Sequence, residues 1–140
     1  MVVELERPRS DISVPAKTVI LLDTNAVIWL DLAHPRSRPL TRNNAALYVS
    51  PATLLELQFL TETNRIRLRG GDAQTLVSDD RWLLDDPPAA AWFAEALELN
   101  WTRDPFDRLI AAHAQLRGWR VATGDTRLLQ ALGTRRTLAL

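Results

Sequence analysis

The sequence contains no cysteine and a single lysine, and its apolar runs are short. Without cysteine there are no disulfides, no thiolate nucleophile and no cysteine-ligated zinc, so any metal must be held by oxygen atoms or by His34 and His113. No run approaches the roughly 20 apolar residues that cross a bilayer, and residues 1–17 lack the apolar core of a secretory signal. We therefore expect a cytoplasmic protein without a membrane segment.

The charges of the chain balance. Seventeen basic and 17 acidic residues give a formal net charge of zero at pH 7, which argues against binding nucleic acid through bulk electrostatics alone. Nearly all of the basic residues are arginines, which bind phosphate groups through a planar fork of donors. With 140 residues, of which 46% are hydrophobic, the chain has the size and the core of one globular domain.

Strand-like and helix-like segments alternate along most of the chain. Residues 1–17 combine two prolines with mixed charge and predict a tail or a partner-binding arm, ahead of one domain over residues 18–140. Strands are expected at 19–22, 47–50, 119–123 and, at an edge, 137–140. Helices are expected at 26–32, 51–63, 72–84, 88–98, 105–117 and 126–132, with a loop at 33–40. This alternation predicts an α/β fold of three layers, α/β/α, with a mostly parallel central sheet.

Two helix starts carry an especially clear local signal. In Ser50-Pro51 and in Asp104-Pro105, an N-cap residue stands directly before a proline at the first helical position. Gly118 is expected to end the helix that begins after Asp104.

Four acidic residues stand at unexpected places in this pattern. Asp23 directly follows the buried run Val19–Leu22, and Asp125 follows a later strand, so both lie at the carboxyl edge of a parallel sheet, where ligands bind. Asp107 and Glu56 lie on helix faces whose neighbours three and four residues away are mainly apolar. Converging carboxylates repel one another unless protons or a cation neutralise them, and an all-oxygen site suits Mg²⁺ or Mn²⁺.

Each acid also has a purely structural interpretation. Asp23 and Asp104 are reasonable helix N-caps, Asp125 a reasonable turn residue, and Glu56 a partly exposed helix residue. The capping role before proline explains Asp104 completely. The case for a site therefore rests on the acids jointly.

The segments VILLDTNAVIWL, SPATLLELQ and DPFDRLIAAHAQLRGWRVATGD, with the spacing between them, resemble the PIN domain over about residues 18–133, in particular the VapC-type toxin nucleases of bacterial toxin–antitoxin pairs. The resemblance implies a compact α/β/α fold that binds Mg²⁺ or Mn²⁺ and cuts RNA. Such proteins usually begin almost at the first strand, so residues 1–17 depart from the pattern. The family's acidic positions correspond to Asp23, Glu56, Asp107 and Asp125, with Asp104 as an extra acid of some members and Thr24, Asn25 and Thr123 as supporting groups.

The same resemblance implies a mechanism and partners. One or two metal ions on Asp23, Asp107 and Asp125 would activate a water for attack on a phosphodiester, while Glu56 holds a second ion or acts as a base. A small VapB-like antitoxin would offer an arginine to the acids, and the protein would form a homodimer. Large apolar residues on the helices expected at 26–32 and 51–63 either contact that antitoxin or fill the core: Ile28, Trp29, Leu55 and Phe59.

Other functions remain open at this stage. A phosphatase of the haloacid-dehalogenase type would need a second acid at Asn25, and a response-regulator receiver needs a lysine after a late strand, whereas Lys17 is the only lysine. A housekeeping RNA-processing nuclease and a non-catalytic PIN-like module that binds RNA or protein are the remaining alternatives. His113, six residues after Asp107 and on another helix face, is expected to be a packing or surface residue.

Overall fold

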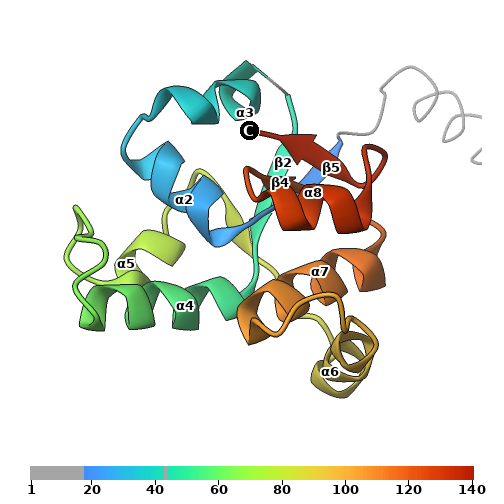
Figure 1. Ribbon diagram of the computed structural model, residues 1–140. Coiled ribbons are helices and arrows are strands. Elements are labelled where there is room, and N and C mark those ends of the chain that lie inside the picture. The colour runs from blue at the N-terminus through green and yellow to red at the C-terminus, as the bar shows by residue number, and fades with distance from the viewer. Residues whose placement is uncertain (1–17, 43) are drawn as a thin grey trace, which may run out of the picture.

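The computed structural model describes residues 18–42 and 44–140. At its centre lies a five-stranded sheet in which all neighbouring strands are parallel, in the order β3-β2-β1-β4-β5 (Figure 1). The strands are β1 (Val19–Leu22), β2 (Ala46–Val49), β3 (Leu83–Leu84), β4 (Arg120–Thr123) and β5 (Thr137–Ala139). The tail expected over residues 1–17 lies outside the described residues.

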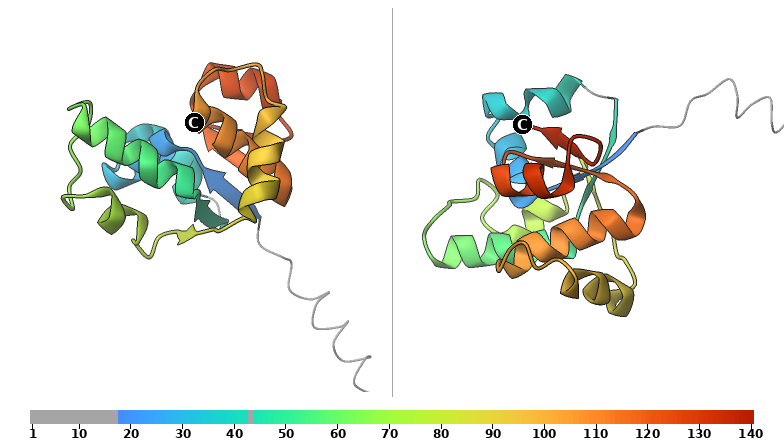
Figure 2. Two further views of the ribbon diagram at one scale, coloured as in Figure 1. Left: turned by 90° about the horizontal axis from the view of Figure 1, so that it is seen from below. Right: turned by 45° about the vertical axis from the view of Figure 1, so that its right-hand side comes forward.

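Helices cover both faces of the sheet, as Figure 2 shows, so the three-layer α/β/α prediction is confirmed. Side chains of β1 alternate between the faces: Ile20 and Leu22 join the buried residues of α2, α3 and α5, and Leu21 joins those of α6, α7 and α8. None of the described helices is long and apolar enough to cross a membrane. The helices are α2 (Thr24–Asp31), α3 (Arg38–Arg42), α4 (Pro51–Glu62), α5 (Ala73–Val77), α6 (Ala89–Leu97), α7 (Pro105–Arg117) and α8 (Thr126–Leu132), with a 3₁₀ turn η1 (Pro35–Ser37).

The helix starts with the clearest local signals form as expected. The Ser50 hydroxyl accepts the backbone N–H of Ala52 over 3.1 Å, and α4 begins at the proline between them. α7 begins directly after its N-cap Asp104 and ends at Gly118, whose φ of +72° is the left-handed conformation that glycine adopts without a steric penalty.

The prediction of a helix over 72–84 is correct only as far as Val77 and wrong for the residues that follow. α5 ends at Val77, and the Trp82 indole N–H then donates to the Val77 carbonyl over 3.2 Å. The chain next forms β3, which pairs with β2, and the Asp85 N–H donates to the Val49 carbonyl over 3.0 Å. Main-chain hydrogen bonds to a strand distant in sequence define β3, so the periodicity of its own side chains could not indicate it.

Two other boundaries differ from expectation near the first helix. α2 begins at Thr24, two residues earlier than predicted, because the side chain of Asp23 serves as its N-cap. The predicted loop at 33–40 contains η1 and the start of α3, where His34 Nδ1 accepts the backbone N–H of Arg36 over 3.1 Å. Both differences arise from side-chain caps.

Candidate active site

Asp23 lies at the carboxyl end of the central strand β1 and is almost completely buried, with 5% of its surface exposed. One carboxylate oxygen accepts the backbone N–H of Ala26 over 2.8 Å, which fixes the orientation of the side chain. Burial raises the pKa of Asp23 to about 6, and the charges of Glu56 and Asp125 act in the same direction. Hydrogen bonds from Thr123 and Ala26 oppose this increase. A buried carboxylate with two acidic neighbours is costly unless its charge is neutralised.

Glu56 reaches the same edge of the sheet from α4. The hydroxyl of Thr24, the first residue of α2, donates to Glu56 Oε1 and lies 3.2 Å from the hydroxyl of Thr53, one turn earlier on α4. Partial burial raises the pKa of Glu56, and the charge of Asp104 raises it further. Thr53 is a residue of the site that was not predicted. Its signal was a polar residue three positions before Glu56 on an otherwise apolar helix face.

Asp107 stands in the first turn of α7 and is electrostatically the most perturbed of the acids. Burial raises its pKa to about 7, followed by the charges of Asp104, Asp125, Glu56 and Asp23 in that order. Four carboxylates that all act on one group must lie near it, because such effects fall off with distance. The structure therefore places the other four predicted acids within electrostatic reach of Asp107.

Asp104 and Asp125 occupy equivalent positions as N-caps of neighbouring helices. Asp104 Oδ1 accepts the backbone N–H groups of Phe106 and Asp107 over 2.8 and 3.3 Å. Asp125 Oδ1 accepts those of Arg127 and Leu128 over the same two distances. In both cases the hydrogen bonds are made by one oxygen of the carboxylate. The capping role considered for Asp104 is thus real, and Asp125, expected to be a turn residue, also caps a helix. Both residues keep Oδ2 available for other contacts.

The two remaining supporting residues behave differently. Thr123, fully buried at the end of β4, accepts the backbone N–H of Asp125 over 3.0 Å through its hydroxyl. Its side chain also hydrogen-bonds Asp23, which lowers the pKa of that carboxyl. The side chain of Asn25 is exposed at the second position of α2. The structure therefore places Thr24 and Thr123 against the acids, and no hydrogen bond in the described residues joins the Asn25 side chain to them.

The donor set suits a hard cation. All five acids offer oxygen atoms, and within residues 18–42 and 44–140 none of them forms an ion pair with a basic side chain. Across the same residues, no three acidic or histidine side chains are already gathered in the arrangement of a metal site. Carboxylates that are close enough to raise one another's pKa, yet unpaired, fit a cation that draws them together on binding.

His113 lies apart from the acids, as expected. It is fully buried in α7, and its Nε2 lies 2.7 Å from Asp85 Oδ2. Arg117, one turn later, donates to the same carboxylate through Nε over 2.8 Å. His113 is therefore a packing residue tied to the end of β3.

The family is identified by comparison with known proteins. The PIN domain model matches residues 20–132. Ribonuclease VapC22 of Mycobacterium tuberculosis is 32% identical over 118 residues, which are 79% of this chain and 90% of that protein. Among solved structures, a toxin–antitoxin complex from Klebsiella pneumoniae matches with a TM-score of 0.61 and 18% identity, covering 86% of this chain and 96% of that one. DNA-bound VapBC from Salmonella typhimurium matches with a TM-score of 0.58 and 24% identity, covering 87% and 98%. These two solved structures share the fold of this chain. The match to the family model and the identity to Ribonuclease VapC22 establish that the chain belongs to the PIN domain family.

Proposed function

We propose that this chain is a metal-dependent endoribonuclease of the VapC type, a toxin that cuts RNA phosphodiester bonds in the cytoplasm. The observation that carries the proposal is the group of five carboxylates at the carboxyl edge of the sheet, unpaired with any basic side chain of the described residues. The likeness to a ribonuclease supports the choice of substrate. Neither a protein nucleophile nor a thiol is needed for such hydrolysis.

We assign different roles to the acids. Mg²⁺ or Mn²⁺ would be held by Asp23, Asp107 and Asp125, and would supply positive charge to the phosphate and lower the pKa of the attacking water. The Ala26 N–H holds the Asp23 carboxylate in one orientation before any ligand arrives. The Thr24 hydroxyl holds Oε1 of Glu56, which leaves Oε2 to accept a proton from the water or to bind a second ion.

The decisive experiment is cleavage of a labelled RNA by the purified protein during titration with Mg²⁺ and with Mn²⁺. We expect cleavage that requires the metal, stops with EDTA and is abolished by Asp23→Asn. The exposed Asp80, whose carboxylate makes no ion pair in the described part of the chain, provides the matched control Asp80→Asn, which should cleave normally. Metal-independent cleavage, or an active Asp23→Asn variant, would contradict the proposal.

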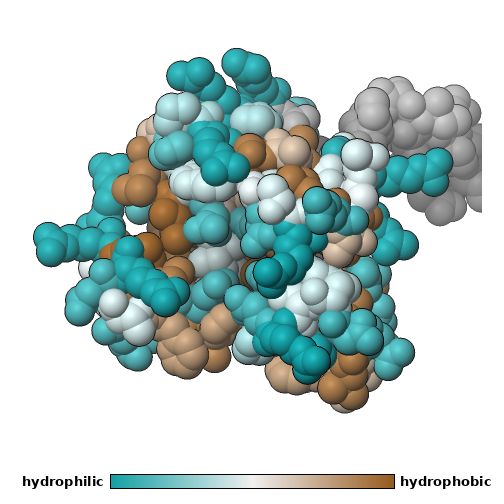
Figure 3. Space-filling view, in the orientation of Figure 1, coloured by the Kyte–Doolittle hydropathy of each residue, from teal (hydrophilic) through white to brown (hydrophobic). Residues whose placement is uncertain are grey.

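A small VapB-like antitoxin is the proposed partner, and α4 is its best-supported contact surface. On α4, Leu55 and Phe59 are 52% and 49% exposed, and Figure 3 shows apolar side chains over this helix. On α2, Ile28 packs against the core, and the Trp29 ring lies under the Arg36 guanidinium at 4.3 Å. Of the four apolar residues considered, Leu55 and Phe59 on α4 are therefore the ones exposed to a partner.

Expression in cells separates the toxin from a housekeeping RNA-processing nuclease. A toxin should arrest growth in a manner that needs Asp23, and the product of an adjacent small reading frame should relieve the arrest. An inhibitory arginine offered to the acids would compete with the metal, so inhibition should weaken as Mg²⁺ rises. Activity without arrest would favour the housekeeping nuclease, and metal-independent RNA binding without cleavage would favour a non-catalytic module.

The homodimer implied by the family has a candidate surface on α6. Phe93 and Leu97 are 53% and 74% exposed there, and together with α7 they border an apolar hollow of about 450 Å³. Measurement of the molar mass in solution, with Leu97→Lys as the disrupting variant, tests the proposed dimer. A monomeric wild-type protein would rule it out.

A further inference from the structure

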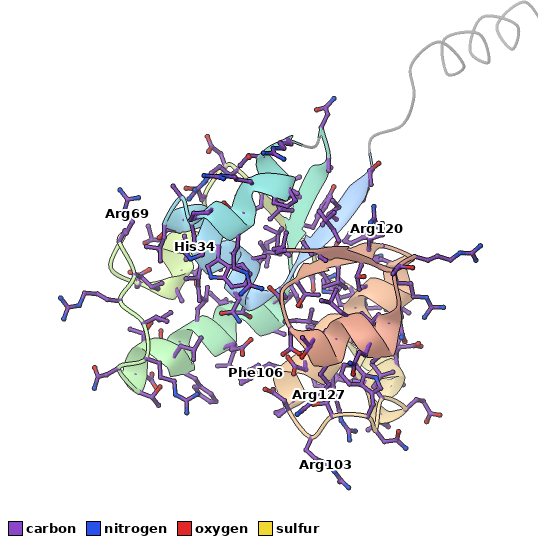
Figure 4. The ribbon with its side chains drawn as sticks, turned by 45° about the horizontal axis from the view of Figure 1, so that its top comes forward. His34, Arg69, Arg103, Phe106, Arg120 and Arg127 are labelled. Atoms are coloured by element: carbon purple, nitrogen blue, oxygen red, sulfur yellow. The ribbon has the colours of Figure 1, made fainter. Side chains whose placement is uncertain are left out.

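A cavity of about 450 Å³ opens between α4 and the start of α7, directly beside the acids. Glu56 and Asp104 belong to its lining, and so do Phe59, Phe106 and the exposed Arg65. Figure 4 shows Phe106 at the start of α7, facing α4. The volume falls within the range of about 300–1,000 Å³ that small-ligand pockets occupy. The cavity is thus continuous with the proposed active site.

Aromatic rings form the apolar part of this cavity. Phe59 and Phe106 meet edge to face, with ring centroids 5.6 Å apart and planes at 84°, and Phe59 remains 49% exposed. Because about half of the Phe59 surface is exposed, that ring remains accessible to a third planar group. Single-stranded nucleic acids use aromatic faces of this kind to stack unpaired bases, whatever their sequence.

The polar atoms of the cavity determine which guest fits. Glu56 and Asp104 make their hydrogen bonds within the described residues through Oε1 and Oδ1, which leaves Oε2 and Oδ2 to accept from a ligand. Two carboxylates exclude a phosphate from the interior, whereas an N–H donor on a planar ring satisfies them. Arg65 forms no ion pair in the described part of the chain and so suits the phosphate next to such a ring.

We propose that this cavity binds an unpaired nucleobase with an exocyclic amino group, next to the scissile phosphate of a single-stranded or looped RNA. The inference rests on the proposed function and adds a base-reading subsite to it. Adenine, cytosine and guanine carry the exocyclic amino donor, whereas uracil lacks it and flanks its single N3–H with two carbonyl oxygens, which the carboxylates repel. Asp104 therefore acts as a specificity-determining residue, and Phe106 and Arg65 provide stacking and backbone contact.

The test measures cleavage of four single-stranded oligonucleotide sets that differ in one base beside the scissile bond. We expect the wild-type protein to discriminate against uracil by about tenfold, since hydrogen bonds to charged groups are the stronger ones. In Asp104→Asn, with Oδ1 still capping α7, the free amide nitrogen can donate to uracil but cannot accept an amino group, so the discrimination should disappear or reverse while cleavage remains metal-dependent. Phe106→Leu and Arg65→Gln should each raise KM about tenfold with little change in kcat.

Matched controls and a second readout keep the outcomes distinct. Arg67→Gln and Phe93→Leu change exposed residues outside the cavity and should leave KM and base preference unchanged. Fluorescence anisotropy of the same oligonucleotides in EDTA reports binding without cleavage, so base preference is measured even if the protein cuts no RNA. Failure of the proposed function would appear as no cleavage by any form.

Cleavage with the same base preference and KM in Asp104→Asn and Phe106→Leu as in the wild type would overturn the base subsite and leave the nuclease intact. A Phe106→Leu variant that loses only its affinity for an inhibitory protein would assign the cavity to that partner instead, and would equally overturn the proposal.

Discussion

Two clusters of ionisable residues share α7, and they have opposite electrostatics. At its first turn, Asp107 faces other carboxylates, and its pKa is raised to about 7 by burial and by their charges. Near its last turn, His113 and Arg117 both contact Asp85, whose pKa lies below its usual range through their hydrogen bonds and charges, although burial opposes this. We infer that the cluster around Asp85 stabilises the fold. The cluster around Asp107 destabilises the metal-free fold, because its negative charges repel one another until a ligand neutralises them.

The cluster around Asp85 also joins two segments that are distant in the sequence. It ties the chain after the short edge strand β3 to α7, because Arg117 donates to both the Asp85 carboxylate and the Asp86 carbonyl. His113 is enclosed by Trp92 and Trp119, with ring centroids 5.4 and 5.9 Å away. Burial lowers the pKa of His113, so the ring is neutral and hydrogen-bonded at neutral pH.

The largest effect should follow from Asp107→Asn. We expect metal-dependent RNA cleavage to fall about 100-fold or more, since an amide neither attracts a cation nor completes the charge of the site. The metal-free variant should melt at the same or a higher temperature than the wild type, because like-charge repulsion is relieved. Calorimetry in EDTA together with a cleavage assay checks both parts. Wild-type cleavage by this variant would show that the proposed site is wrong.

The next largest effect should come from Asp85→Ala at the other cluster. Its loss leaves both nitrogens of the buried His113 ring without a partner, because Nδ1 already lacks one in the described structure. We expect the free energy of unfolding to fall by about 3 kcal/mol, while kcat on a stable fraction is unchanged. Urea denaturation measures the loss. Asp86→Ala, which removes an exposed neighbouring carboxylate, is the control and should change stability little.

The stability of the metal-free protein should depend on pH in opposite directions for the two clusters. The pKa values of Asp23 and Asp107 are raised from 3.8 to about 6 and about 7, so their contribution to stability is complete below about pH 4 and is lost as the pH rises through 6 and 7. The lowered pKa of His113 has the opposite effect, because the contribution of this residue to stability is lost as the pH falls below 6.5. We expect the acids to remove about 3 kcal/mol between pH 4 and 8, which is what the raised pKa of the buried Asp23 alone corresponds to.

Urea titrations in EDTA across this pH range provide the measurement. The Asp107→Asn variant should lose less stability toward high pH than the wild type, and added Mg²⁺ should also reduce the wild-type loss. A wild-type stability that rises steadily from pH 5 to 8 would contradict the assignment of raised pKa values to the acids.

The smallest effect is expected for Asp104→Asn. Asparagine caps a helix about as well as aspartate, so stability should change by less than about 0.5 kcal/mol, and most cleavage activity should remain. Thermal melting and the summed cleavage rate over all four oligonucleotide sets check this. A loss as large as that of Asp107→Asn would show that Asp104 is an essential metal ligand.

Much of the fold could be predicted because its signals are local. The Ser50-Pro51 and Asp104-Pro105 starts, the glycine at 118 and the buried run before Asp23 each act within a few residues, and the structure has each of them as predicted. The helix predicted over 72–84 failed because β3 exists only through pairing with β2. Side-chain periodicity carries no information on such a partner.

For the site, the sequence by itself determined the identity of the acids and the edge on which they lie, because parallel strands end on the same side of a sheet. Only the tertiary structure decided how they interact: the Thr24 hydroxyl donates to Glu56 across 32 residues, and the charges of four other carboxylates raise the pKa of Asp107. It also decided that Asp85, nowhere distinctive in the sequence, pairs with His113. The physical reason is that burial and Coulomb interactions depend on distance in space, which residue order alone does not specify.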